Sequence, residues 1–167
     1  MDTTNQTLSE LTIIQFNCNH SNHKGIRPFF NSLNPKNQHI IAIQESERYT
    51  KNGSTYCPYG YSLAMPIDPD THVAFLVSNE LRMANWQLKT HSPHLASLVL
   101  NLAESKAQIF NSYVPSSTIS RDTTTAVLLE ARRAIAEMLT ERESENNNQE
   151  AEKSILYQED FNLHHSE

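Results

Sequence analysis

The sequence predicts a single α/β domain built largely from β-strands, and three observations support this. Short apolar runs rich in β-branched and aromatic residues recur along most of the chain, as is typical of strands. A strand, a helix and a second strand follow one another early in the chain, which is the pattern of an α/β unit. The chain has 167 residues, enough for one domain with a continuous core.

The composition narrows the class of protein. Hydrophobic residues make up 38% and charged residues 19%, which indicates a globular rather than a disordered chain. The net charge is -6 and no run of Lys or Arg occurs, which argues against tight unaided binding to nucleic acid. No apolar run approaches the roughly 20 residues that span a bilayer. With two cysteines, Cys18 and Cys57, and no signal segment, we expect an intracellular, reducing location.

The first elements are a strand, a helix and a second strand. Residues Met1–Glu10 are polar, and we expect a disordered segment there. The run Leu11–Cys18 predicts a buried strand that opens the domain, residues 11–167. A helix should carry the apolar positions of Ile26–Leu33, with Pro28 in its first turn. The run His39–Glu45 predicts a second buried strand, which ends in a carboxylate.

The middle of the chain predicts sheet rather than helix. Its short apolar segments are separated by Pro, Asn, Asp and Ser and show no helical period. We expect several of these strands to pair as antiparallel neighbours. The five predicted strands are Tyr61–Met65, Val73–Ser78, Trp86–Thr90, Leu95–Leu102 and Gln108–Tyr113.

One long helix and a last strand complete the domain. The helix is predicted at Asp122–Arg142, with Ser120 as its cap. The acidic, Asn-rich continuation Glu143–Lys153 predicts a solvated loop. The run Ser154–Tyr157 predicts a final strand that leads to Asp160. The residues expected on the buried face of the helix are Leu128, Ala131, Ile135 and either Met138 or Leu139.

Polar side chains lie at or just after the ends of the predicted strands. They are Asn17, Glu45, Tyr113, and Asp160 with Asn162. Strand ends that meet at one edge of a sheet-built domain are where a rigid scaffold presents functional groups. A carboxylate with an amide neighbour can hold a Mg²⁺ that keeps most of its waters. A second carboxylate can orient or deprotonate a water, while an amide and a phenol donate to phosphate oxygens.

Each of these residues also has a purely structural interpretation. Glu45 could be a solvated residue at the end of a strand. Tyr113 could be a packed ring with a hydrated hydroxyl group. Asp160 and Asn162 could form a turn that binds its own backbone. The histidines His72, His91 and His94 are expected at the surface or at strand edges.

Four motifs in a fixed order resemble the endonuclease/exonuclease/phosphatase family, the deoxyribonuclease I-like superfamily. The resemblance covers nearly the whole chain from Leu11 onward. Two stretches, Asp160–His165 and Val73–Val77, are most similar to endonuclease domains of non-long-terminal-repeat retrotransposons. The four motifs are Phe16–Asn19, Ile43–Glu45, Asn111–Pro115 and Asp160–Asn162.

The resemblance implies a fold, an activity and a role for each residue. The fold would be a four-layered α/β sandwich of two mixed sheets flanked by helices. The activity would be DNA cleavage by phosphodiester hydrolysis with Mg²⁺, or with Mn²⁺ in its place. Glu45 would bind the metal with support from Asn17, Tyr113 would contact phosphate, Asp160 would orient the attacking water, and Asn162 would bind phosphate. The resemblance also implies that the protein derives from, or is fused to, a reverse-transcriptase polyprotein and that it acts in the nucleus.

Two departures from the family pattern define the alternatives. Glu159 stands where the family has Gly before the Asp-Phe-Asn core, adding bulk and like charge beside Asp160. The family's downstream Ser-Asp-His motif does not occur before Glu167, so we expect a fold incomplete at the C-terminus, lacking its final strands. An exposed sheet edge would then favour self-association. A catalytically inactive remnant or binding module is the alternative function; a metabolite or lipid phosphatase would need a basic pocket, which the sequence does not show.

Overall fold

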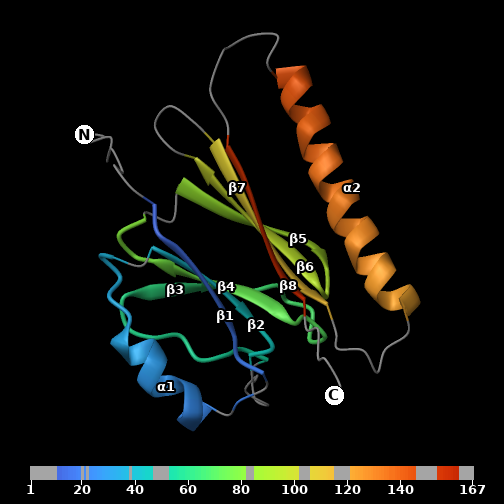
Figure 1. Cartoon of the computed structure of the whole chain (residues 1–167). Helices are drawn as coiled ribbons and strands as arrows, with labels where there is room; N and C mark the ends of the chain where they lie inside the picture. The colour runs from blue at the N-terminus through green and yellow to red at the C-terminus, as the bar shows by residue number, and fades with distance from the viewer. Residues whose placement is uncertain are drawn as a thin grey trace, which may run out of the picture.

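The structure, a computed structural model, describes residues 11–19, 21, 23–37, 39–46, 53–81, 85–101, 106–114, 121–145 and 154–161, with the backbone alone for residues 23, 121–124, 141–145 and 154–161. This part of the chain forms two β-sheets and two helices (Figure 1). The first sheet has the strand order β1 (Ile13–Asn17), β2 (Ile40–Gln44), β4 (Val73–Ser78), β3 (Tyr61–Ala64). The second has the order β5 (Trp86–Ser92), β6 (Leu95–Asn101), β7 (Lys106–Val114), β8 (Ser154–Phe161). The helices are α1 (His23–Ser32) and α2 (Arg121–Glu145).

Each sheet is mixed, and its parallel pair is important for the site. In the first sheet β1 and β2 run parallel, with Asn17 paired to Gln44 at their common end. In the second sheet β7 and β8 run parallel, with Tyr113 paired to Asp160. The other pairs, β2 with β4, β3 with β4, β5 with β6 and β6 with β7, are antiparallel. The expected mixed α/β fold, made mostly of strands, is therefore confirmed.

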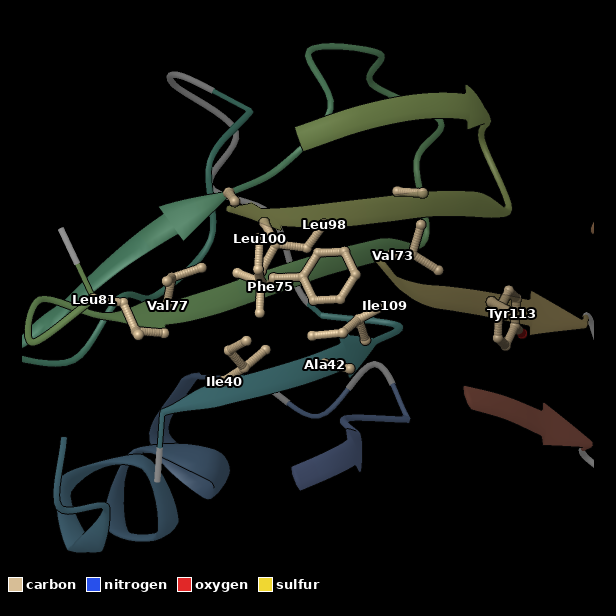
Figure 2. Close-up of a cluster of buried hydrophobic side chains, with 12 residues drawn as sticks. Ile40, Ala42, Val73, Phe75, Val77, Leu81, Leu98, Leu100, Ile109 and Tyr113 are labelled. Atoms are coloured by element: carbon tan, nitrogen blue, oxygen red, sulfur yellow. The ribbon is translucent and has the colours of Figure 1, made fainter. Parts of the chain in front are cut away.

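The main core lies between the two sheets. Phe75 of β4 is fully buried there, and Figure 2 shows its ring among side chains of both sheets. Alternate residues of β2 and β4 contribute to this core, while the residues between them enter a second core that includes Ile26 and Phe30 of α1. Because β2 and β4 are buried on both faces, their sequences are continuous apolar runs rather than alternating ones.

The second sheet packs against α2 through a third core. Leu95 and Phe110 of the sheet meet Ala131, Ala134 and Met138 of the helix. The helix therefore buries Met138 and leaves Leu139 44% exposed, which decides between the two residues considered from the periodicity. None of the helices in the described ranges is long and apolar enough to cross a membrane.

Three local predictions were wrong. The strand at Leu11–Cys18 was expected to be buried, but β1 is half-buried along its length. Pro28 is not in the first turn of its helix, because α1 begins at His23 and Pro28 is its sixth residue. Pro28 has no N–H to donate to the carbonyl oxygen of Lys24, four residues earlier. Both residues are exposed, so water can bond that oxygen instead. The last strand is longer than the predicted Ser154–Tyr157, since β8 continues to Phe161, although Asp160 does lie at the end of this strand as predicted. The predicted disordered segment 1–10 and the Ser120 cap lie outside the described residues.

The inter-sheet core should dominate stability. Replacing Phe75 with Ala should lower the free energy of unfolding by about 3–5 kcal/mol, because the cavity lies where both sheets meet. Ile67→Ala is the control, since that side chain is 99% exposed and its loss should cost less than about 0.5 kcal/mol. Urea unfolding of the two variants gives the comparison, and equal losses would contradict this placement of the core.

Candidate functional site

The ends of β2 and β7 meet face to face across the two sheets. Gln44 ends β2 and Glu45 follows it, while Asn111 and Tyr113 lie near the end of β7. All four side chains are buried, with exposed fractions of 6% or less. Burying a polar group is costly unless it is hydrogen-bonded. Here the four side chains bond to one another across the sheets, although Oε1 of Gln44 is buried without a partner in the described part of the chain.

Glu45 is held in an uncommon backbone conformation. Its φ angle is +49°, a left-handed value that costs a non-glycine residue roughly 1–2 kcal/mol. Its N–H donates to the carbonyl oxygen of His72 at 2.9 Å, which ties it to the segment before β4. The carboxylate is 6% exposed and accepts a bond from the facing sheet. Strain of this kind persists where surrounding contacts over-determine the conformation, as they do at functional sites.

Tyr113 reaches Glu45 from the second sheet. Its hydroxyl group donates to Oε1 of Glu45 at 2.5 Å. Its own N–H donates to the carbonyl oxygen of His94 at 2.9 Å, in the turn between β5 and β6. Tyr113 is therefore a packed ring, as one interpretation held, but its hydroxyl group binds the candidate metal ligand directly.

The other predicted site residues lie next to this pair. Asn17 is the register partner of Gln44, and its Oδ1 accepts a bond from the N–H of Asn19 at 2.6 Å. Asp160 is the register partner of Tyr113 and is the next-to-last residue of β8. Asn162 lies outside the described residues. The structure thus places Asn17 and Asp160 one strand away from the Glu45–Tyr113 pair, one on each sheet.

An amide pair beside Glu45 joins the two sheets. Nε2 of Gln44 donates to Oδ1 of Asn111 at 2.5 Å. The Nδ2 group of Asn111 donates to the carbonyl oxygens of Ile43 at 3.1 Å and Ala74 at 2.9 Å, in β2 and β4. We call the Asn111 and Gln44 side chains the amide clamp. Sequence reasoning missed its role, although a buried amide inside an apolar strand such as Ile109–Val114 signals a specific partner.

The charge of Glu45 affects a neighbouring thiol. Cys18 is 2% exposed, and its N–H donates to the carbonyl oxygen of Gln44 at 2.9 Å. Burial, with a further contribution from the negative charge of Glu45, raises the pKa of the Cys18 thiol to about 12. Cys18 is therefore a neutral, inert packing residue beside the site rather than a nucleophile.

Two histidines border the site. The rings of His72 and His94 stack at 5.0 Å, and the Tyr113 ring lies 5.1 Å from that of His72. Both are half-buried, and each lies one residue before a strand, His72 before β4 and His94 before β6. His91 is in β5, at the edge of the described sheet as expected, and stacks on Phe110. Sequence spacing does not reveal this arrangement, since the three rings come from three separate segments.

The donor groups of the site include a carboxylate and an amide oxygen, the kinds of ligand that Mg²⁺ takes. No three His, Cys, Asp or Glu side chains in the described ranges are grouped so that they could hold a metal ion. Structural and catalytic zinc need three or four protein ligands, whereas Mg²⁺ binds through one or two carboxylates together with water and phosphate oxygens. Glu45 supplies one carboxylate. The amide oxygen of Asn17, which accepts a bond from Asn19, is a donor group of the kind that Mg²⁺ takes.

No protein-family model matches the chain, and the search of curated proteins gives no significant match. The functional inference therefore rests on the residues of the site.

The amide clamp should show strong coupling. Asn111→Leu or Gln44→Leu should each lower the free energy of unfolding by about 2 kcal/mol or more, because the remaining amide loses its buried partner. The double variant should lose less than the sum of the single losses, since both polar groups are then removed. Chemical denaturation measures all three, and strictly additive losses would contradict the clamp.

The stability should fall in mildly acidic solution through His91. Burial lowers the pKa of His91 from its ordinary value, and its Nε2 pairs with Oγ of Ser97 at 2.9 Å. The unfolded chain, with a histidine pKa of about 6.5, then binds more protons than the folded chain below that pH. The contribution of neutral His91 to the free energy of unfolding is complete above about pH 6.5. It is lost as the pH falls toward the pKa of His91 in the folded chain. In the variant His91→Gln the midpoint of unfolding should therefore decline less steeply as the pH is lowered. A decline as steep as in the wild type would contradict this.

Proposed function

We propose that this protein hydrolyses phosphodiester bonds in DNA with the help of Mg²⁺, on a four-layered α/β sandwich of the endonuclease/exonuclease/phosphatase type. The observation that supports this most directly is the Glu45–Tyr113 hydrogen bond across the two sheets. Asn17 and Asp160 occupy the flanking strands beside that pair. The motif resemblance names all four residues, and they lie at or near the ends of four strands, β1, β2, β7 and β8.

Each residue has a chemical role in the proposed reaction. Glu45, with Asn17 in support, would hold Mg²⁺, whose positive charge would stabilise the charge that develops on the phosphate oxygens. Asp160 would accept a proton from the attacking water. The oxygen of that water bonds to phosphorus as the bond from phosphorus to the leaving oxygen breaks. Tyr113 would donate from its hydroxyl group to a non-bridging oxygen. That proton now lies toward Glu45, so a phosphate oxygen at this edge would compete for it.

A non-catalytic binding module on the same scaffold is the second candidate. The observation that favours it is the position of Glu159, which pairs with Ser112 immediately before the Tyr113–Asp160 pair. Glu159 adds a second carboxylate next to Asp160 in the sequence, and its like charge disfavours the binding of an anionic phosphate nearby. Such a module would keep metal or phosphate affinity but would not turn over substrate.

Nicking of supercoiled plasmid with Mg²⁺ tests the first candidate. Glu45→Gln and Asp160→Asn should each slow nicking by about 100-fold or more, because they remove the carboxylates that hold the metal and take the proton. Tyr113→Phe should slow it by roughly 10- to 100-fold, since one donor to phosphate is lost.

Glu80→Gln is the matched control, because Glu80 is exposed just after β4, away from the Glu45 end of the sheet. It should nick at the wild-type rate. Wild-type protein that nicks no faster than Glu45→Gln would exclude catalysis by these residues. A rise in melting temperature with Mg²⁺ that Glu45→Gln abolishes, without nicking, would support the binding module instead.

A further inference from the structure

Three aromatic rings lie together beside Glu45, and we call them the ring cluster: His72, His94 and Tyr113. The imidazole rings stack at 5.0 Å with an interplanar angle of 13°. Tyr113 packs at 5.1 Å from His72 and 6.1 Å from His94, tilted by 32° and 45°. The phenol ring is therefore bordered by two imidazoles at the position from which its hydroxyl group reaches Glu45.

Backbone hydrogen bonds connect the same segments. The carbonyl oxygen of His72 accepts the N–H of Glu45, and the N–H of His72 donates to Pro93 at 2.8 Å. The carbonyl oxygen of His94 accepts the N–H of Tyr113 at 2.9 Å. The turn that contains Pro93 and His94 thus bonds to the segment before β4 on one side and to β7 on the other. Movement of this turn would change the distance between Glu45 and Tyr113.

The chemistry of His94 indicates that its ring face matters more than its nitrogens. Its Nδ1 is buried and has no hydrogen-bond partner in the described part of the chain. Burial lowers the pKa of His94, opposed in part by the charge of Glu130 on α2, so the ring is neutral near pH 7. A neutral ring with a buried, unpartnered nitrogen contributes by packing. Its contacts are with the rings of His72 and Tyr113.

We propose that His94 is a positioning residue that holds the Tyr113 ring in the orientation from which its hydroxyl group binds Glu45. The planar face of His94 does this, and its nitrogen atoms are dispensable. Truncation to alanine would leave the phenol free to tilt away from Glu45, whereas a phenylalanine ring would keep it in place. The consequence for catalysis rests on the proposed function, but the effect on the Tyr113–Glu45 bond does not.

A comparison of melting temperatures tests the proposal without any activity. Tyr113→Phe should lower the melting temperature of the wild type, because a buried carboxylate loses a donor. In a His94→Ala background the same change should lower it by less than half as much, since the bond is already weakened. In a His94→Phe background the full loss should return. An equal loss in the His94→Ala and wild-type backgrounds would overturn the proposal.

His91→Ala is the matched control. His91 lies in the same hairpin and also stacks on a ring, but that ring is Phe110, at 5.8 Å, on the side of the sheet that faces α2. Tyr113→Phe should therefore retain its full effect in this background. If His94→Ala does not fold, His94→Leu, which keeps apolar volume without a planar face, replaces it in the comparison. A reduced Tyr113→Phe loss in the His94→Phe background would also overturn the proposal.

Plasmid nicking then separates this proposal from the proposed function. His94→Ala should lower kcat about tenfold with little change in KM, because the misplaced phenol affects the reacting phosphate rather than DNA binding. His94→Phe should keep the wild-type kcat and the wild-type pH–rate profile, which a proton-transferring histidine could not. If the wild type does not nick DNA, the proposed function fails, while the melting comparison still decides the role of His94.

Discussion

The amide clamp is the interaction on which the candidate site depends. Asn111 bonds the side chain of Gln44 and two backbone carbonyl groups of the first sheet, and these bonds fix the position of β7 relative to β2. Glu45 follows Gln44 by one residue, and Tyr113 follows Asn111 by two. Once the clamp is formed, the carboxylate and the phenol must face each other at the same edge of the two sheets. An apolar contact surface alone is non-directional and would not select one alignment.

The apolar cores stabilise this polar arrangement. Phe75 and its neighbours exclude water from the space between the sheets, which strengthens every hydrogen bond made there. The same exclusion would penalise any of these groups left without a partner. Burial therefore favours the arrangement in which these groups bond to one another across the sheets. The left-handed backbone of Glu45 fits this account, because its N–H bond to His72 holds a conformation that the residue alone would avoid.

Much of the local structure could be predicted from the sequence. The strand Val73–Ser78 was predicted with its observed bounds, and the long helix was placed to within a few residues. Those predictions succeeded because continuous apolar runs and a helical period report burial directly. The prediction for Pro28 failed because a proline is usually read as a helix start, whereas an exposed helix face tolerates it one turn later.

By itself the sequence determined the strands, the helices and the types of residue at the strand ends, because these follow from periodicity within short segments. Only the tertiary structure decided which strand ends meet. The Glu45–Tyr113 bond spans 68 residues of sequence and the Gln44–Asn111 bond spans 67, and neither leaves a periodic trace. The placement of His72 and His94 beside Tyr113 has the same origin, since three separate segments bring the rings together. Contacts of this kind depend on how the two sheets stack. The packing of their apolar cores and the bonding of their few buried polar groups determine that stacking.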